Sequence, residues 1–306
     1  MDSAAVIVKQ MCIMFLYMGI GFWMYKKKLI TKDGSKEFAN LLLFIILPAV
    51  IMNSFIEGQG SQDIRVLITA MAAGIILLLL AMLIAGMCLK KDGIANFSAA
   101  FSNAGFMGIP LIVALIGSKS VIYIAGMTAF LNILQWFYGQ RILEDKNIRQ
   151  KLNIKDIVFN PLVLSFVVGL FLLFTKINVP SILKITIEKT ASLNAPIAMI
   201  IMGIYMAQTE IGRLFTEKKL YAITLIRLIG IPVCSIIILK YFPFLTLDVK
   251  KALLIAAAAP VGANVAVYAQ KLGKDYGYAV RAVCISTLFS IVSMPMCIYL
   301  AELCWK

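Results

Sequence analysis

The stretch FSNAGFMGIP, residues 101–110, places an asparagine, two glycines and a proline inside an otherwise apolar segment. A second stretch, AAAAPVGANVAVYAQKLG at residues 256–273, combines the same residue types. Proline removes one helical hydrogen bond and blocks another, and hydrocarbon offers no replacement partner, so the freed carbonyls must face protein, water or a ligand. We therefore expect two helices that are broken near Pro110 and Pro260.

The composition around these stretches is that of an integral membrane protein. Of the 306 residues, 61% are hydrophobic and 14% are charged, whereas a soluble domain has about 25% charged residues. The mean hydropathy is +0.93. The net charge of +14 comes from short basic clusters between apolar runs, where membrane topology requires them, so we expect no nucleic-acid partner.

The sequence predicts neither a metal site nor a cofactor. It contains no histidine, and its six cysteines show no CxxC spacing. We expect the cysteines to be free thiols that pack as small apolar residues. Because the apolar segments offer no His/Glu metal set, Asp pair or Ser/His arrangement, we do not expect an enzyme.

Ten apolar segments have about the length of a spanning helix, which is roughly 20 residues. They predict an all-α, polytopic membrane protein with little chain left for a further domain. In chain order the segments are 4–25, 38–56, 66–89, 94–117, 121–140, 157–175, 191–208, 220–240, 252–270 and 278–300.

The polar stretch 141–156 divides these segments into five before it and five after it. Because each half has an odd number of spans, the second half must be inverted relative to the first. The fourth and ninth segments share proline, glycine and asparagine, and the second and seventh contain Pro48 and Pro196. We therefore expect a 5+5 inverted repeat, with the first repeat at 1–141, a cytoplasmic linker at 142–156 and the second repeat at 157–306.

Basic residues predict the orientation of the segments in the cell membrane. Lys and Arg are concentrated in alternate connections, beginning with Lys26, Lys27 and Lys28, and are sparser in the intervening ones. Short loops that are rich in lysine and arginine stay in the cytoplasm. This rule places the linker in the cytoplasm and both termini on the extracytoplasmic side.

Several short motifs are shared with a known family. The most specific is MGIPL at 107–111, and LQWFYG follows it at 134–139. Further agreement is found in LPAVIMNSF at 47–55, NP at 160–161, MGIYMAQTEIG at 202–212 and the stretch at 256–273. With these motifs the whole chain resembles the auxin efflux carrier family, which includes plant auxin exporters and bacterial malate-permease-like proteins.

The resemblance implies a secondary transporter that moves an organic (carboxylate) anion across the cell membrane by alternating access. It also implies that the fourth and ninth helices cross at Pro110 and Pro260 near the midplane. Helices 1, 2, 6 and 7 would form a dimerising scaffold, and helices 3–5 and 8–10 a moving transport bundle. The expected partners are a small organic acid, the lipid bilayer and a second copy of the chain.

The resemblance further implies a set of substrate contacts near the crossing. They are Asn103, Gly105, Gly108 and Pro110 on the fourth helix, Gln135 and Tyr138 on the fifth, Pro260 and Gly262 on the ninth, and Asn53 or Ser54 from the scaffold. Helical periodicity adds two further polar positions, Asn132 and Asn264.

The charges within the segments bear on the substrate. No Asp or Glu lies inside the ten segments, and Arg227 is the one deeply placed charge. Its side chain either reaches the cytoplasmic interface, pairs with helix-end carbonyls or attracts an anion. Neutral amides and the N-termini of half-helices suit an anionic ligand, because aimed N–H groups stabilise negative charge.

The alternative function is a sodium/proton or other cation antiporter with a similar broken-helix layout. Such chemistry normally needs a buried carboxylate to bind the ion, and the ten segments contain none. The sequence leaves open which acid is carried, in which direction it moves and which ion, if any, is coupled to it.

Overall fold

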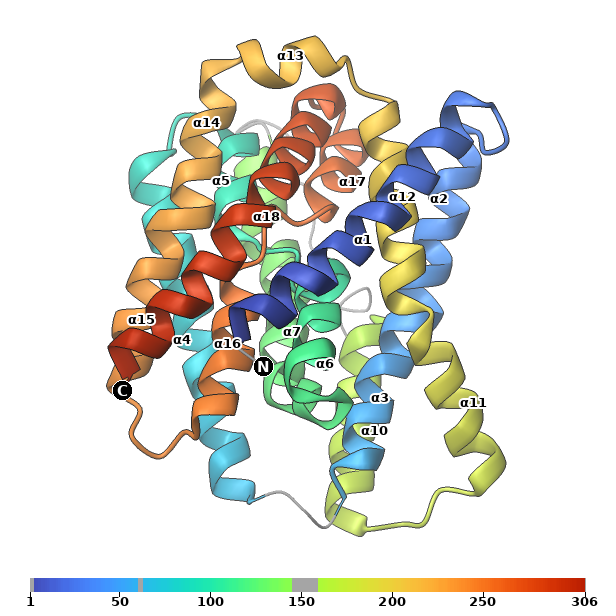
Figure 1. The fold of residues 1–306 in the computed structure, drawn as a ribbon, viewed down its shortest axis with the longest axis vertical. Coiled ribbons are helices and arrows are strands. Elements are labelled where there is room, and N and C mark those ends of the chain that lie inside the picture. The colour runs from blue at the N-terminus through green and yellow to red at the C-terminus, as the bar shows by residue number, and fades with distance from the viewer. Residues whose placement is uncertain (1–2, 60–62, 145–158, 306) are drawn as a thin grey trace.

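The computed structural model describes residues 3–59, 63–144 and 159–305, and these residues form an all-helical protein (Figure 1). They contain no β-strand apart from one isolated bridge. The helices before the linker are α1 (Ser3–Lys26), α2 (Lys32–Leu41), η1 (Leu42–Ile46), α3 (Leu47–Glu57), α4 (Ile64–Cys88), α5 (Gly93–Ala100), η2 (Ala104–Gly108), α6 (Ile109–Ile116), η3 (Ser118–Val121), α7 (Ile122–Leu134), η4 (Gln135–Gly139) and α8 (Gln140–Leu143).

Most of the expected linker, residues 145–156, lies outside the described residues. The helices that follow it are α10 (Pro161–Thr175), α11 (Ser181–Ser192), α12 (Asn194–Ala207), α13 (Ile211–Thr216), α14 (Lys218–Leu225), η5 (Ile226–Gly230), α15 (Ile231–Lys240), α16 (Leu247–Ala258), α17 (Asn264–Lys271) and α18 (Tyr276–Trp305).

Fewer helical runs have spanning length than the ten that the sequence predicts. Within the described ranges, seven are long and apolar enough: Ser3–Lys26, Lys32–Glu57, Ile64–Cys88, Ser118–Leu143, Ser181–Ala207, Lys218–Lys240 and Tyr276–Trp305. The sixth expected segment is represented by α10, and its expected start at residue 157 is not described. The fourth and ninth are each divided between shorter helices, because the chain leaves helical geometry between α5 and η2 and between α16 and α17.

Three prolines within apolar helical runs follow π-helical turns. The turns η1, η2 and η5 each end two residues before a proline, at Pro48, Pro110 and Pro232. A π turn changes the hydrogen-bond register, which relieves the loss of the proline N–H and the clash of its ring without ending the helix. The expectation of a break at Pro110 is therefore corrected, because the non-helical residues are 101–103, well before this proline.

Small residues allow α1 and α12 to pack backbone against backbone. A Cβ added to Gly21 would collide with the backbone of Ile200, and one added to Gly203 would collide with the backbone of Met18. Close approach at glycine is the common way for membrane helices to associate, because lipid provides little hydrophobic drive between them. Glycine is therefore required at both positions.

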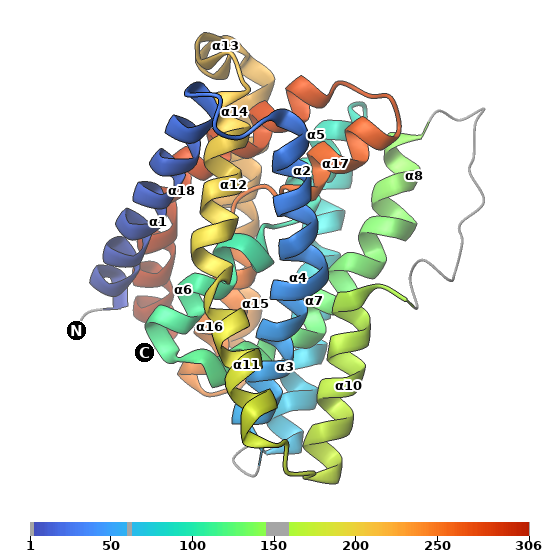
Figure 2. The same ribbon diagram turned by 90° about the vertical axis from the view of Figure 1, so that its right-hand side faces the viewer.

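The main helix contacts fall into two groups. In one group α1 packs on α12, and α3 packs on α10 and α11; in the other α4 packs on α5 and α7. Figure 2 shows α3, α10 and α11 together toward one end of the molecule. Aromatic packing of Phe55 on Phe166, with ring centroids 5.9 Å apart, holds α3 against α10. Contacts of α1 with α6 and α18 join the groups.

Candidate functional site

Two non-helical stretches, 101–103 and 259–263, meet in the middle of the molecule, and we call their meeting point the crossing. The Asn103 N–H donates to the Pro260 carbonyl at 2.8 Å, and the Gly262 N–H donates to the Phe101 carbonyl at 3.0 Å. These bonds form an antiparallel bridge between Ser102 and Val261. A Cβ on Gly262 would lie 3.0 Å from the Ser102 carbonyl oxygen, so a glycine suits this close approach.

Arg227 stabilises the carbonyl ends of the two helices that lead into the crossing. Its Nη1 donates to the Ala99 oxygen at 2.9 Å and to the Ala100 oxygen at 3.5 Å, and its Nε donates to the Ala259 oxygen at 3.1 Å. The residue is only 1% exposed. The C-terminal end of a helix carries partial negative charge, so the guanidinium compensates both α5 and α16. Of the roles considered for Arg227, pairing with helix-end carbonyls is the one observed.

A small cavity beside these stretches, the crossing cavity, brings five of the expected site residues together. Its volume is about 40 Å³, which is room for one or two water molecules and not for an organic acid. Leu47, Ile51 and Leu162 close it on the apolar side. The expected site residues that line it are Asn103, Gly105, Asn132, Gly262 and Asn264.

Some of the buried amide side chains at the crossing have N–H donors for which no described residue supplies an acceptor. The Asn264 Nδ2 donates to the Gln135 Oε1 at 2.8 Å, and the Asn132 Nδ2 donates to the Thr128 carbonyl at 2.8 Å. The Asn103 Nδ2 and the Gln135 Nε2 have no partner among the described residues, although these side chains are 4% and 1% exposed. An unpaired buried donor costs about 1–3 kcal/mol. A ligand with acceptor oxygens in the crossing cavity would satisfy the Asn103 Nδ2, because Asn103 lines this cavity.

A second cavity, the Glu57 cavity, has a volume of about 310 Å³ and contains Asn53 and Pro110 of the expected site. The Asn53 Nδ2 donates to the Glu57 Oε1 at 2.9 Å, and the Ser118 hydroxyl donates to the Glu57 Oε2. The Asn53 Oδ1 has no partner in the described part of the chain. A second carboxylate, Glu188, also lines this cavity, so its polar groups are mainly acceptors.

Asn194 connects the two cavities. It lines the Glu57 cavity, and its Nδ2 donates to the carbonyl of Gly105, which lines the crossing cavity, at 3.2 Å. Sequence reasoning missed Asn194, although it is the one asparagine in its apolar segment. It also missed Ser286, whose hydroxyl accepts from the Val261 N–H at 3.1 Å, and no feature of the sequence distinguishes this serine.

The remaining expected residues lie near the crossing but line neither cavity. The Ser54 hydroxyl donates to the Ile51 carbonyl within its own helix at 2.7 Å, and the Tyr138 hydroxyl donates to the Asn96 Oδ1 at 3.2 Å. Gly108 faces the backbone of α16, with room for a Cβ at van der Waals distance. Pro260 contributes its carbonyl to the bridge, and Gln135 is reached through Asn264.

Comparison with known proteins identifies the family. The profile of the family described as "Membrane transport protein" matches residues 6–155 and 146–298. A protein of Rhizobium meliloti (strain 1021) named "Putative malonate transporter" is 24% identical over 276 residues, which cover 85% of this chain and 84% of that protein. The chain therefore belongs to the membrane transport protein family, the auxin efflux carrier family that its motifs predicted, and it is a multi-pass membrane transport protein.

Proposed function

We propose that this protein is a secondary transporter of a small organic carboxylate anion, which binds at the crossing and moves by alternating access. The observation that carries the proposal is the pair of unpartnered buried donors, the Asn103 Nδ2 and the Gln135 Nε2. A carboxylate offers only acceptor oxygens when it is ionised. It is the ligand class that satisfies both donors without leaving a donor of its own unpaired.

The helix ends around the crossing support an anion for an independent reason. The carbonyl ends of α5 and α16 are covered by Arg227. The opposite ends, at the start of η2 and of α17, have no side-chain cap. Uncapped N-termini present N–H groups and partial positive charge, which stabilise an anion without burying a full cation beside it. The N-termini of η2 and α17, which carry the partial positive charge, are therefore available to bind the substrate.

Among organic acids, we propose that a dicarboxylate is the preferred substrate. The relative from Rhizobium meliloti is named for malonate, and the motifs resemble malate-permease-like proteins. One carboxylate of such an acid pairs with the unpartnered amide donors, and the other reaches the backbone N–H groups at the start of η2 or α17. The amide N–H groups bind the carboxylate oxygens and do not distinguish the carbon chain between them. We therefore expect other short dicarboxylates to compete with malonate.

The architecture that we propose for transport is the ten-helix 5+5 inverted repeat with two broken, crossing helices. The packing of α1 on α12 and of α3 on α10 and α11 supports a scaffold of expected helices 1, 2, 6 and 7. The rest of the chain forms the transport bundle. We propose that the scaffold dimerises, that both termini are extracytoplasmic and that the linker at 142–156 is cytoplasmic.

Polar contacts between scaffold and bundle occur on both sides of the crossing, which supports alternating access. At one end the Tyr276 hydroxyl donates to the Gln208 Oε1 at 3.1 Å, and Lys32 lies over the Tyr276 ring at 4.9 Å. Toward the other end Ser118 of the bundle donates to Glu57 of the scaffold. Both sets of contacts are formed and the crossing cavity is only about 40 Å³, so we infer a closed intermediate of the proposed cycle.

The cation antiporter remains the alternative, but the crossing does not favour it. None of the described residues that line the crossing cavity is a carboxylate, and both Glu57 and Glu188 line the neighbouring Glu57 cavity. A cation at the crossing would face unpaired donors, which repel it. We therefore expect cation gradients to be neither dissipated nor generated by the protein alone.

Uptake of labelled malonate into proteoliposomes tests the proposal. We expect saturable uptake by the parental protein, competition by other short dicarboxylates and a loss of at least tenfold in Asn103→Ala. Asn96→Ala is the matched control, because Asn96 is also buried in the same bundle but contacts Tyr138 outside the cavity. Absence of carboxylate uptake, together with collapse of an imposed sodium or proton gradient, would establish the antiporter instead.

A further inference from the structure

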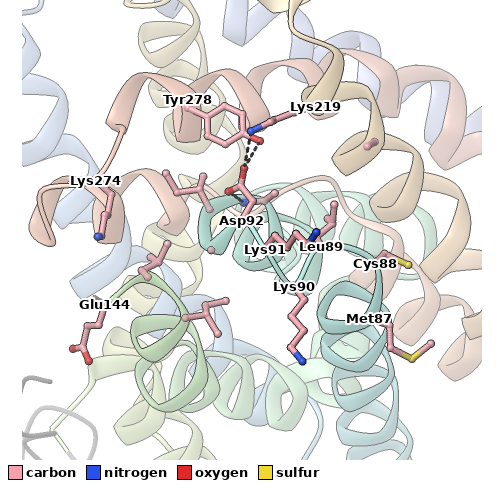
Figure 3. Close-up of a pocket in the computed structure, with 16 residues that line it drawn as sticks. Met87, Cys88, Leu89, Lys90, Lys91, Asp92, Glu144, Lys219, Lys274 and Tyr278 are labelled. Atoms are coloured by element: carbon pink, nitrogen blue, oxygen red, sulfur yellow. Dashed lines mark hydrogen bonds and ion pairs between the residues drawn. The ribbon is translucent and has the colours of Figure 1, made fainter. Parts of the chain in front are cut away.

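A large cavity of about 910 Å³ lies at the N-terminal end of α5, away from the crossing cavity, and we call it the basic groove (Figure 3). Four lysines from three separate parts of the chain converge on it, together with two carboxylates. These residues are Lys90, Lys91, Lys219, Lys274, Asp92 and Glu144. No contact that defines the proposed substrate site involves them.

The two carboxylates of the basic groove are already engaged by neighbouring residues. Asp92 accepts from the Tyr278 hydroxyl at 3.4 Å, pairs with Lys219 at 3.7 Å and caps α5 through the Ala95 N–H at 3.0 Å (Figure 3). Glu144 accepts from the Gln140 Nε2 at 2.7 Å. Lys90 and Lys91 make no ion pair with any described residue, so the groove retains excess positive charge.

The basic groove is open to the lipid-facing surface along one apolar edge. Met87 and Cys88, at the end of α4, line the groove and are exposed, Met87 by 72%. Ala222 of α14 lines the same edge. Leu83 and Leu225 continue the exposed surface of the same two helices, each 60% exposed. A ligand that fills the groove can therefore combine an anionic head with an apolar tail.

We propose that the basic groove binds the headgroup of an anionic phospholipid. Lys90 and Lys91 contact the phosphate, and the acyl chains leave along Met87 toward Leu83 and Leu225. Basic pockets between membrane helices recognise anionic headgroups in this way, and each lysine near the surface contributes to the attraction. The apolar edge selects the lipid over a soluble phosphate, because a soluble ion gains nothing from Met87 and Cys88.

The test measures binding of short-chain phosphatidylglycerol to the purified protein in an uncharged detergent. Phosphatidylcholine of the same chain length, inorganic phosphate and glycerol phosphate are the comparison ligands. The test variant is Lys90→Gln with Lys91→Gln. The control is Lys26→Gln with Lys27→Gln, which removes the same charge from another pair of adjacent exposed lysines at the end of a spanning helix. Unchanged melting of both unliganded variants excludes a folding effect.

We expect phosphatidylglycerol to bind more tightly than phosphatidylcholine, and the Lys90 and Lys91 variant to weaken this binding by about tenfold to thirtyfold. The control variant changes it less than twofold. Equal losses in both variants would mean attraction by the whole basic surface and would overturn the site. Binding of phosphate or glycerol phosphate as tight as that of the lipid would overturn the assignment to a phospholipid.

Discussion

The crossing cavity and the Glu57 cavity are neighbours, since Ile109 lines both, yet they have opposite polarity. Among the described residues, the first is lined by an unpaired amide donor, the Asn103 Nδ2, and by no carboxylate. The second is lined by two carboxylates and by two asparagines, Asn53 and Asn194, whose amide oxygens are unpaired. We therefore expect an anion to be stabilised in the first cavity and repelled in the second. The comparison indicates that the local balance of donors and acceptors, and not the net charge of +14, distinguishes the two cavities as ligand sites.

The largest effect is expected from Arg227→Met, which removes the charge that holds the helix ends beside the crossing cavity. Three buried carbonyls lose their donor, and each unsatisfied buried acceptor costs about 1–3 kcal/mol, so we expect the unfolding free energy to fall by about 3 kcal/mol or more. Thermal melting in detergent measures the change. Arg213→Met is the control, because Arg213 is exposed and, among the described residues, forms an ion pair with Glu210 alone. Equal melting temperatures for the two variants would contradict the structural role of Arg227.

The next largest effect is expected from Asn103→Asp, which gives the crossing cavity the acceptor character of the Glu57 cavity. The substitution keeps the shape of the side chain but replaces a donor by a carboxylate that faces the substrate. We expect malonate affinity to fall by about 100-fold, since an unfavourable charged contact at a binding site costs 2–5 kcal/mol or more. Direct titration with malonate measures it. An affinity within threefold of the parental value is the result that excludes Asn103 as a ligand.

A smaller effect is expected from Gly262→Ala, which alters the spacing of the two crossing stretches and leaves the polar groups unchanged. The added Cβ lies 3.0 Å from the Ser102 carbonyl oxygen, so the backbone must move slightly. We expect a loss of about 1–3 kcal/mol in stability and a lower transport rate. Gly230→Ala, where no atom lies within 4 Å of the new Cβ, is the control and should melt no lower than the parental protein.

The smallest effect is expected from Glu57→Gln, which removes a negative charge from the Glu57 cavity. The remaining amide oxygen can still accept from the Asn53 Nδ2, and the new NH2 group can donate to the Ser118 hydroxyl, so the stability should change by less than about 1 kcal/mol. Because the repulsion near the crossing is reduced, malonate should bind up to about threefold more tightly. Titration of this variant beside the parental protein measures the shift. Weaker malonate binding would show that the two cavities do not differ in the way we describe.

The membrane class, the family and much of the crossing could be predicted from the sequence, because they rest on local patterns. Apolar runs of spanning length predicted most of the long helices. The family resemblance implied Asn103 and helical periodicity added Asn264, and both line one cavity. A neutral amide in an apolar helix needs hydrogen-bond partners, and few places in the fold provide them. Asn103 and Asn264 therefore lie together.

The positions of the helix breaks and the contacts at the crossing could not be predicted from the sequence. The effect of a proline on a helix depends on the preceding turn and on the neighbouring helices. The π turns η1, η2 and η5 accommodate Pro48, Pro110 and Pro232, and no pattern in the sequence distinguishes such a turn from a break. The pairing of Arg227 with carbonyls of α5 and α16 depends on three segments distant in sequence. Glu57 lies just beyond the apolar segment in sequence, and only the packing of α3 brings it into a cavity.

The measurement that tests the central claim most directly is ligand-dependent melting of the purified protein with malonate and with its neutral diamide, malonamide. The two molecules have similar shape, but only malonate has acceptor oxygens without donors. At 100 times the parental Kd, malonate should stabilise the parental protein by about 2.7 kcal/mol, whereas malonamide should not protect it. At the same malonate concentration, Asn103→Asp should be stabilised by only about 0.4 kcal/mol. Equal protection by both molecules, or undiminished protection of Asn103→Asp, would contradict a carboxylate site at the crossing.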